Sequence, residues 1–302
     1  MTPSKNNKTR VSIGIPVYNG DRYLAAALDS FRAQSFGDFE IIVSDNASTD
    51  RTGDIARDYA GIDPRIRYVR QDRNIGAGPN HNCLLDLAES PYFKWAAHDD
   101  LYEPTYLEKC VAILDRRPDV VLAHSDGQMI DERSRPLTFN PIRQIYTDRS
   151  GHEVPKEPAN VCLSELPSER FDDVLHRLVW CSAMYGLFRR DIASHLTLKR
   201  NFYGSDKVLL SEMALLGKFH HIAEALFKKR YHATMSARLD ADRRRVFMDT
   251  ERPAASPYFE LLKGYLKAAM RVGDIDRPER LRCIASIMRK TARARYWRRQ
   301  AA

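Results

Sequence analysis

Two adjacent carboxylates, Asp99 and Asp100, follow a short apolar run and give the sequence its sharpest chemical signal. Two acids at the end of a buried strand are costly unless a positive charge compensates them. Carboxylate oxygens are ligands that Mg²⁺ and Mn²⁺ prefer. The pair therefore predicts a divalent metal site. A solvated turn ahead of a helix, where acids favour the N-terminus, explains the pair equally well at this point.

Two other predicted strand ends carry groups suited to a nucleotide. Tyr18 can stack on a base, and Asp45 can accept a hydrogen bond from a base edge or a ribose hydroxyl. Simple packing also explains a tyrosine, and Ser48 or Thr49 can cap the helix that follows Asp45. The phosphate loops G-x-x-x-x-G-K-[ST] and G-x-G-x-x-G do not follow the first strand, which disfavours a P-loop NTPase and an NAD enzyme.

Short apolar runs alternate with helical stripes through the first 116 residues. The runs predict strands over 11–17, 39–45, 66–69 and 92–96, and the stripes predict helices over 21–34, 48–59, 78–88 and 104–114. This alternation is typical of βαβ units and predicts an α/β fold with a largely parallel sheet. Ligands of such sheets lie beyond the carboxyl ends of the strands, where the polar residues above are expected.

The second half of the sequence is less regular. Residues 119–131 suggest a pair of strands. Residues 132–170 are rich in Pro, Arg and Glu, which predicts a long loop of the kind that forms an active-site lid or lacks order. Order returns over 171–232, where 221–231 resembles a strand, and 251–302 predicts two or three helices.

Composition excludes several classes of protein. Of the 302 residues, 43% are hydrophobic and 29% are charged, which is typical of a soluble globular chain. No window approaches the roughly 18 apolar residues of a membrane-spanning helix, and the polar N-terminus does not resemble a secretory signal. Five widely spaced cysteines without a C-x-x-C pair disfavour a disulfide framework or a zinc site. We therefore expect a cytoplasmic protein with reduced thiols.

The net charge of +8 is concentrated at the C-terminal end. Residues 277–302 contain nine basic residues and one acidic residue, so this segment accounts for the whole net charge. That distribution disfavours nucleic-acid binding by the globular part. Apolar residues recur at helical spacing over 281–297 among arginines, and such a helix can lie on an anionic membrane at the inner face of the cell membrane. A terminal helix packed on the protein, with a solvated basic face, is the alternative.

Four segments, in order, resemble the family 2 glycosyltransferases of GT-A fold: V-S-I-G-I-P-V-Y-N-G, F-E-I-I-V-S-D-N-A-S-T-D-R-T, N-I-G-A-G-P-N-H-N and W-A-A-H-D-D-L-Y-E-P. They match over 11–116, and weaker matches continue to about residue 235. The resemblance implies a Rossmann-like GT-A domain over 1–235. Within it, 11–116 would be the nucleotide-sugar-binding half and 117–235 the acceptor-binding half, followed by a helical basic extension over 236–302.

The same resemblance implies an activity. A nucleotide-sugar donor, UDP-linked, would bind with Mn²⁺ or Mg²⁺, and the sugar would be transferred with inversion to an acceptor hydroxyl. The acceptor would be a saccharide or a lipid-linked saccharide, in surface polysaccharide or glycoconjugate synthesis.

On the donor side, the resemblance implies that Tyr18 stacks on the base and that Asp45 hydrogen-bonds it. Asp99 would bind the metal that bridges the diphosphate, with Asp100 beside it at the end of a D-x-D motif. The nucleotide-binding candidates are Pro16, Val17, Tyr18, Asn19, Asp45, Arg73, Gly76, His98 and Asp99. Two positions depart from the family pattern, because Asn46 and Ala97 stand where the family often has acids. His98 would touch the ribose or the metal, or be merely structural.

On the acceptor side, Asp206 begins a predicted helix and is the candidate general base. A helix start favours the charged carboxylate that must take the proton of the acceptor hydroxyl, although the same residue could simply cap the helix. His232, in a late R-x-H element, would bind the metal or a phosphate. Trp180, Tyr185 and Gly186 resemble the segment that lines the acceptor pocket.

Two rival functions use the same architecture. A catalytically inactive nucleotide-binding or scaffold protein is suggested by Ala97 and Asn46. A sugar-nucleotide pyrophosphorylase would need a glycine-rich, basic phosphate loop after the first strand, which the sequence lacks. The sequence leaves the identity of the sugar, the acceptor and the linkage open.

Overall fold

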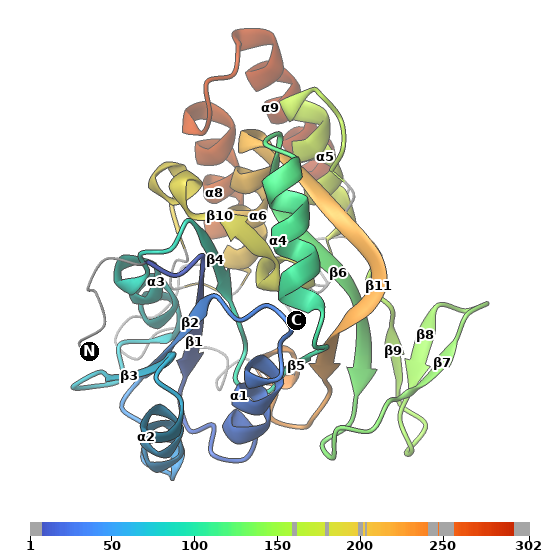
Figure 1. Ribbon diagram of the computed structural model, residues 1–302. Helices are drawn as coiled ribbons and strands as arrows, with labels where there is room; N and C mark the ends of the chain where they lie inside the picture. The colour runs from blue at the N-terminus through green and yellow to red at the C-terminus, as the bar shows by residue number, and fades with distance from the viewer. Residues whose placement is uncertain are drawn as a thin grey trace.

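The computed structural model describes residues 8–158, 162–178, 181–198, 202, 204–240, 247 and 257–292. The first half follows the predicted alternation (Figure 1). Its elements are β1 Val11–Val17, α1 Leu24–Arg32, β2 Phe39–Asp45, α2 Thr52–Ile62, β3 Ile66–Arg70, α3 Ala77–Leu87, β4 Tyr92–Trp95, β5 Leu101–Tyr102 and α4 Tyr106–Arg116. The four predicted strands and four predicted helices are therefore confirmed, with shifts of a few residues at their ends.

The second half departs from the prediction in two places. Its elements are β6 Val120–Ile130, β7 Thr138–Asn140, β8 Ile145–Thr147, β9 Glu153–Pro155, α5 Pro167–Arg177, η1 Ser182–Tyr185, β10 Leu187–Arg189, η2 Arg190–His195, α6 Ser205–Leu216, β11 Lys218–Arg230, η3 Ser236–Arg238, α8 Pro257–Arg271 and α9 Arg277–Ala292. Residues 120–130 form one long strand and not a pair, because its polar stretch around Gly127 continues the pairing with β11. The predicted loop contains a small sheet, β7-β8-β9, whose three-residue strands are too short to show alternation.

The centre of the described structure is a mixed sheet of eight strands, in the order β3-β2-β1-β4-β10-β6-β11-β5. Strands β1 to β4 pair in parallel, as predicted for βαβ units. The short strand β10 enters antiparallel between β4 and β6 and so joins the two halves into one sheet. Strand β11 runs parallel to β6 and antiparallel to β5, which directly follows Asp100.

Two apolar cores lie on opposite faces of this sheet. Successive side chains of a strand point to opposite faces. Ile41 and Val43 of β2 therefore join the core made with α1, α2 and α4, while Ile42 joins the core made with α3, α5 and α6. Burying both faces explains why these strands are apolar throughout rather than alternating.

The two C-terminal helices share a third core with α5 and α6. Leu261 and Tyr265 of α8 and Ile287 of α9 are buried with Phe171 of α5 and Val208 of α6. In Figure 1 this bundle stands at the top of the molecule, above the sheet. No helix within the described residues is both long and apolar enough to cross a membrane.

Candidate functional site

The register of the sheet places the predicted strand ends at one edge. Val17 pairs with Asp45, and Asp45 pairs with Arg70, in parallel strands. Strand β4 runs parallel to β1 on its other side and leads through Ala96 and Ala97 toward Asp99. The prediction that these residues share an edge is therefore confirmed, while their roles toward a ligand stay predictions.

The loops after β1 and β2 are hydrogen-bonded to each other. The backbone N–H of Asn19 donates to Ser48 Oγ at 2.9 Å, and Thr49 N–H donates to Asn19 Oδ1 at 2.8 Å. Neither Ser48 nor Thr49 caps the next helix, which corrects that prediction: α2 begins at Thr52, whose N–H donates to Asp50. Tyr18 is 46% exposed at this edge. Pro16 and Val17 are buried within β1.

Asp45 is fully buried and its carboxylate is satisfied by protein donors. Ser48 N–H donates to Oδ1 at 2.8 Å, and Tyr68 Oη and Arg70 Nη1 each donate to Oδ2 at 2.7 Å. This carboxylate thus fixes the turn after β2 and holds the exposed arginine of β3 beside it. Arg70, a residue that the sequence analysis does not select, is the exposed member of this group.

Asn46, which replaces a common family acid, holds the loop before α3. Its Nδ2 donates to Asn74 Oδ1 at 2.8 Å, and its Oδ1 accepts the N–H of Ile75 at 2.8 Å. Gly76 then adopts a φ of 85°, a conformation that favours glycine, and α3 begins. Arg73 is exposed in the same loop. An amide can donate and accept at once, which a carboxylate cannot, so this position suits Asn.

Strand β11 brings its far end to the Asp99–Asp100 turn. His232 Nε2 lies 2.9 Å from Asp99 Oδ2, and the backbone N–H of Arg230 donates to Asp100 Oδ1 at 2.8 Å. The Asp99 side chain is 18% exposed, whereas Asp100 is 3% exposed and faces the protein. The predicted grouping of Asp99, Asp100 and His232 is therefore present, although only Asp99 of the two acids is partly open to solvent.

Burial and nearby charges shift the pKa values of Asp99 and Asp100 in opposite directions. Burial alone would raise the pKa of Asp99, but the hydrogen bond with His232 and the nearby His98 hold it below its ordinary value. Burial raises the pKa of Asp100, and the charge of Asp99 raises it further. Asp99 is thus the member of the pair that is held as a carboxylate.

Arg230 is the connecting residue that the sequence interpretation missed. Its guanidinium donates to the carbonyl oxygen of Asp99 at 2.7 Å, to that of Asp131 at 2.9 Å and to Ser134 Oγ at 3.0 Å. The side chain is 2% exposed and lies over the ring of Tyr23 at 4.6 Å. The R-x-H pattern was the available signal, but only its histidine had been assigned a role.

His98 and Tyr23 complete the surroundings of the turn. A Cβ placed on Gly20 would lie 2.5 Å from His98 Cδ2, so His98 packs against the loop after β1. The Tyr23 ring lies 5.1 Å from that of His232, and its buried hydroxyl has no hydrogen-bond partner among the described residues. The turn is therefore lined by polar groups from both halves of the chain.

Asp206 and Tyr185 are two of the residues predicted for the acceptor side. Asp206 is half-buried in the first turn of α6, where its Oδ1 accepts the N–H of Lys207 at 3.0 Å. Burial raises the pKa of the Tyr185 phenol, and the charges of Asp100, Asp99 and Asp206 raise it further. The charges of three candidate acids, from the turn after β4 and from α6, thus act on one tyrosine.

Gly186 and Trp180 are the other two residues predicted for the acceptor side, and the structure describes only the first of them. Gly186 is buried against β6, where a Cβ would lie 2.7 Å from the carbonyl oxygen of Ala123. Its position is therefore set by the close approach of β10 to β6. Trp180 lies outside the described residues.

The donor set around Asp99 suits a metal that arrives with other ligands. Among the described residues, no group of three or more His, Cys, Asp and Glu side chains is placed to hold a metal ion. Asp99 and His232 supply one carboxylate and one imidazole. The other imidazole nitrogen, Nδ1, lies 2.9 Å from Thr234 Oγ1, and Nε2 contacts Asp99, so a metal bound here would take the place of the proton between Nε2 and Asp99. Two protein donors beside the unpaired Tyr23 hydroxyl fit a cation completed by phosphate and water.

Comparison with known protein families and with curated sequences identifies glycosyltransferases in both cases. The model of the family "Glycosyl transferase family 2" matches residues 12–196. A relative from Rickettsia prowazekii (strain Madrid E), an uncharacterised glycosyltransferase, is 29% identical over 265 residues, which is 85% of this chain and 71% of the relative.

Solved structures show the same fold. TarS of S. aureus (residues 1–349, in complex with UDP-GlcNAc) gives a TM-score of 0.62 at 15% identity, covering 92% of this chain and 71% of that one. The mannosyltransferase PcManGT from Pyrobaculum calidifontis, in complex with GDP-Man and Mn²⁺, gives 0.52 at 15% identity, covering 96% and 77%. With the family model matching more than half of the sequence, the chain belongs to glycosyl transferase family 2 and is a glycosyltransferase of GT-A fold.

Proposed function

We propose that this enzyme transfers a sugar from a UDP-sugar, with a divalent metal and with inversion, to a hydroxyl of a saccharide or lipid-linked saccharide acceptor. Surface polysaccharide or glycoconjugate synthesis is the setting that such an acceptor implies. The observation that carries the proposal is the contact of His232 with Asp99 and of the Arg230 backbone with Asp100 at the carboxyl edge of the sheet, together with Asp206 in the first turn of α6.

Asp99 and His232 are the residues that would hold Mn²⁺ or Mg²⁺. When bound, the metal neutralises the negative charge that develops on the leaving diphosphate. Arg230 holds the backbone of Asp99 in place, and Asp100 binds the backbone of β11. These two contacts keep the turn from moving as charge develops, which is what a preorganised site requires.

Asp206 is the proposed base. Its carboxylate accepts the proton of the acceptor hydroxyl as the oxygen forms a bond to the anomeric carbon of the donor. The bond from that carbon to the phosphate oxygen breaks, its electron pair leaves with the nucleoside diphosphate, and the configuration inverts. The position at the start of α6 favours the charged carboxylate before transfer.

Tyr18 is the proposed platform for the base of the nucleotide. Its half-exposed ring at the carboxyl edge of β1 is open to stacking. The solved TarS complex contains UDP-GlcNAc, and the Pyrobaculum complex contains GDP-Man. Uridine is the proposed base because the TarS structure gives the higher TM-score. A GDP-sugar is the alternative donor, so it is tested beside the UDP-sugars.

The deciding experiment compares Asp206→Asn with the wild type. Transfer should fall about 1,000-fold because the base is lost, while UDP affinity with Mn²⁺ stays within twofold. Glu169→Gln is the matched control, since Glu169 is an exposed acid in the first turn of α5. Sugar release from UDP-GlcNAc, other UDP-sugars and GDP-Man is measured with and without Mn²⁺. Wild-type turnover by Asp206→Asn would remove Asp206 from the mechanism.

The rival is a nucleotide-binding protein without activity, suggested by Asn46 and Ala97. Asn46 has a structural role here that explains its identity without any loss of catalysis. UDP binding with neither transfer nor hydrolysis of any donor in the screen would favour the inactive protein.

We also propose that α9 contacts an anionic membrane. Cys283 and Ile287 face the protein, whereas Leu281 is 66% and Met288 is 60% exposed. Arg282 and Arg289 follow these two residues, and their side chains are 60% and 58% exposed. An exposed apolar stripe flanked by arginines fits a bilayer surface that contains acidic lipids.

Vesicle flotation tests this contact. The full chain should float with vesicles containing phosphatidylglycerol and not with phosphatidylcholine alone, and high salt should weaken the binding. The double variant L281S/M288S should bind about tenfold more weakly. Ile62→Ser on α2 removes an equally exposed apolar side chain, at 65%, and serves as the control. Equal flotation with both vesicle types would contradict the proposal.

A further inference from the structure

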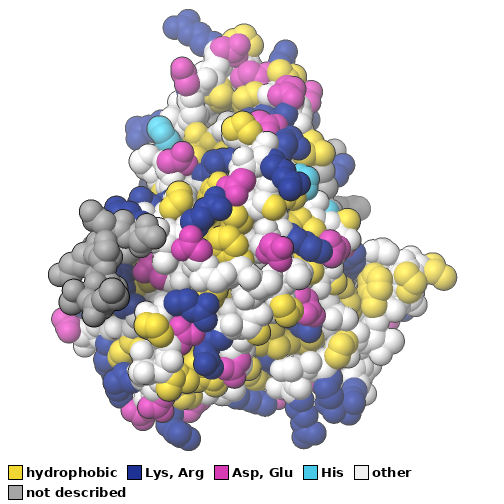
Figure 2. All heavy atoms as spheres, viewed as in Figure 1, with side chains coloured by type: hydrophobic (Ala, Val, Ile, Leu, Met, Phe, Trp, Pro, Cys, Tyr) yellow, Lys and Arg dark blue, Asp and Glu magenta, His cyan; other side chains and the backbone are white. Residues whose placement is uncertain are grey.

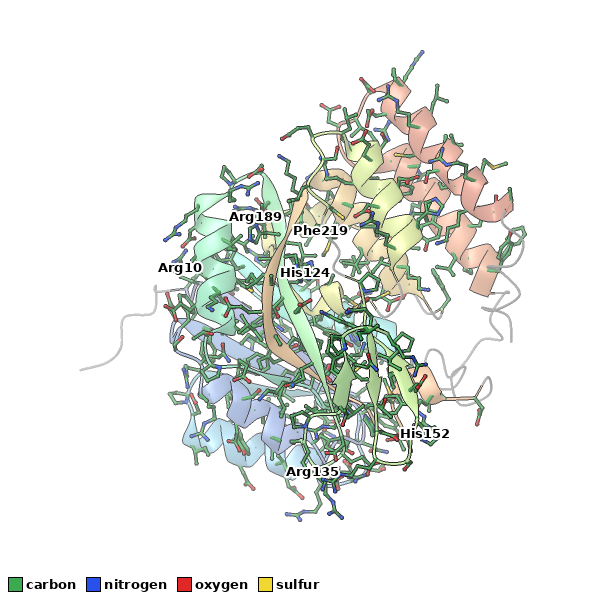
Figure 3. The ribbon with its side chains drawn as sticks, turned by 90° about the vertical axis from the view of Figure 1, so that its right-hand side faces the viewer. Arg10, His124, Arg135, His152, Arg189 and Phe219 are labelled. Atoms are coloured by element: carbon green, nitrogen blue, oxygen red, sulfur yellow. The ribbon has the colours of Figure 1, made fainter. Side chains whose placement is uncertain are left out.

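A polar cavity lies between β6, the small β7-β8-β9 sheet and η1. It offers about 40 Å³ to water-sized groups. A buried water needs about 10–15 Å³ by the same kind of measure, so the cavity has room for a few hydroxyl-sized groups. Figure 3 shows His124 where β6 and β11 run side by side, and the register pairs His124 with His221. Nothing in the proposed donor site uses these residues.

The cavity is lined by charged groups that are already held in place. Asp126 lies 3.0 Å from His221 Nε2 and 3.2 Å from Lys156 Nζ. Glu157 accepts the backbone N–H of Ser182 at 3.1 Å, and Lys229 Nζ lies 3.4 Å from Ser182 Oγ. Two carboxylates and two ammonium groups cancel in formal charge. A preorganised and neutral lining favours groups that donate and accept hydrogen bonds together, and disfavours an anion.

Helix η1 connects this cavity to the proposed reaction centre. Ser182 at its start contacts the cavity residues Glu157 and Lys229, and η1 packs against α6, whose first turn carries Asp206. Burial raises the pKa of the Cys181 thiol, and the charges that act on it include those of Asp206, Glu157 and Lys229. This four-residue turn thus contacts both the cavity and the helix that carries the proposed base.

The residue before this turn is strained. Cys181 has a φ of 58° and a ψ of 28°, a left-handed conformation that costs a residue with a Cβ about 1–2 kcal/mol. Such strain persists only where the surroundings impose it, and it is common at binding sites. Glu157 accepts the N–H of Ser182 at one end of the turn, and Tyr106 Oη donates to the carbonyl oxygen of Tyr185 at 3.0 Å at the other.

Apolar surface completes the lining. Met129 and Tyr146 are buried at the cavity. The Tyr146 hydroxyl donates a hydrogen bond to the carbonyl oxygen of Gly127 at 2.9 Å, which leaves the ring as apolar lining. A sugar presents hydroxyls at its edge and C–H groups on its faces, so it matches a polar recess beside an apolar wall.

We propose that this cavity is an acceptor subsite that receives the hydroxyl-bearing edge of a neutral saccharide. It rests on the proposed glycosyltransferase reaction and adds to it the class of acceptor. Asp126 and Glu157 accept hydrogen bonds from the sugar hydroxyls, while Lys156 and Lys229 donate to them. The sugar then lies along η1, with its reactive hydroxyl directed toward Asp206.

Binding of methyl glycosides to the full chain tests the subsite. Saturation-transfer NMR compares methyl glucoside, galactoside, mannoside and N-acetylglucosaminide with two anions, glucuronate and glycerol 3-phosphate, each with and without UDP and Mn²⁺. At least one neutral glycoside should bind more tightly than either anion. Glu157→Gln and Asp126→Asn should each weaken that binding about tenfold, the effect of one charge-assisted hydrogen bond.

Two variants outside the cavity are matched controls. Glu153→Gln changes an exposed acid on β9 that pairs with Arg143, and Lys228→Met changes the neighbour of Lys229 that pairs with Glu103. Both should bind glycosides as the wild type does. Thermal unfolding and UDP affinity of every variant separate a local effect from a folding defect.

Three results would overturn the subsite: no neutral glycoside binds, an anion binds more tightly, or both cavity variants keep wild-type affinity. If UDP binds with Mn²⁺ and the glycosides fail, only the subsite is wrong. If the wild type neither binds UDP nor transfers sugar, the proposed function fails, whatever the glycosides do.

Discussion

The predicted nucleotide half (11–116) and the predicted acceptor half (117–235) position their polar groups in different ways. In the predicted nucleotide half, the partners lie in neighbouring loops, 28 to 30 residues apart in the sequence. Asn19 contacts Ser48 and Thr49, and Asn46 contacts Asn74. In the acceptor half, Arg230 and His232 reach back to Asp99, across 131 and 133 residues. The Asp99–Asp100 turn therefore depends on both halves, although its residues belong to the first. Figure 2 shows acidic and basic side chains intermixed on the viewed face, so charge alone does not distinguish the halves there.

Removing Arg230 should have the largest effect. Arg230→Met would leave the carbonyl oxygens of Asp99 and Asp131 unsatisfied and should lower the free energy of unfolding by about 3 kcal/mol. Arg238→Met, at an exposed arginine that lies over Tyr231, is the control. Denaturant unfolding and UDP binding measure both variants. A variant as stable as the wild type, with unchanged UDP affinity, would show that the halves do not share the turn.

Removing the Asp99 carboxylate should act on the nucleotide half alone. Asp99→Ala should weaken Mn²⁺-dependent UDP binding about 100-fold, or about 2.7 kcal/mol, because one of two protein donors is lost. Binding in EDTA should not change. Asp58→Ala removes an exposed acid of α2 for comparison. Calorimetry with and without metal decides, and equal losses in EDTA would argue against a metal role.

A local ion pair of the nucleotide half should affect stability without affecting function. The hydrogen bonds from Arg65 lower the pKa of Asp63 to about 2, below the value of 3.8 expected when unfolded. Because the folded-state pKa is depressed, this stabilisation is present above pH 4 and is lost as the pH falls toward 2. Asp63→Asn should therefore cost about 2 kcal/mol at pH 7 and less at pH 3. A penalty independent of pH would exclude the ion pair as its source.

The smallest effect is expected at the edge of the sheet. Tyr18→Ala should weaken UDP binding about tenfold, the value of one stacked base, and leave stability unchanged because the ring is half-exposed. Tyr18→Phe keeps the ring and should bind as the wild type does. Isothermal titration with UDP measures both. If alanine binds UDP as tightly as phenylalanine, the base lies elsewhere.

The sequence predicted the nucleotide half well because its signals are local. Apolar runs such as 11–17 and 39–45 lie fully inside the sheet, so each strand is recognised from its own residues. Parallel pairing then places the residues that follow Val17 and Asp45 at one edge. Helix caps were less predictable, since Asp50 and not Ser48 satisfies the start of α2.

The acceptor half was harder because its contacts join distant segments. Nothing near Arg230 in the sequence indicates that its guanidinium binds the backbone at Asp99 and Asp131. The strands of the small sheet have three residues each, too few for a periodic pattern. Lys156 and Glu157 lie in the segment interpreted as a loop, so the cavity could not be foreseen.

The shared core of α5, α6, α8 and α9 has a practical consequence for anyone who shortens this protein. The sequence suggests a boundary near residue 235, and a truncation there would remove Leu261, Tyr265 and Ile287. Val208 and Leu215 of α6, the helix whose first turn carries Asp206, would then be exposed to water. We therefore expect a stable unit to extend through α9, because its removal would expose the helix that carries the proposed base.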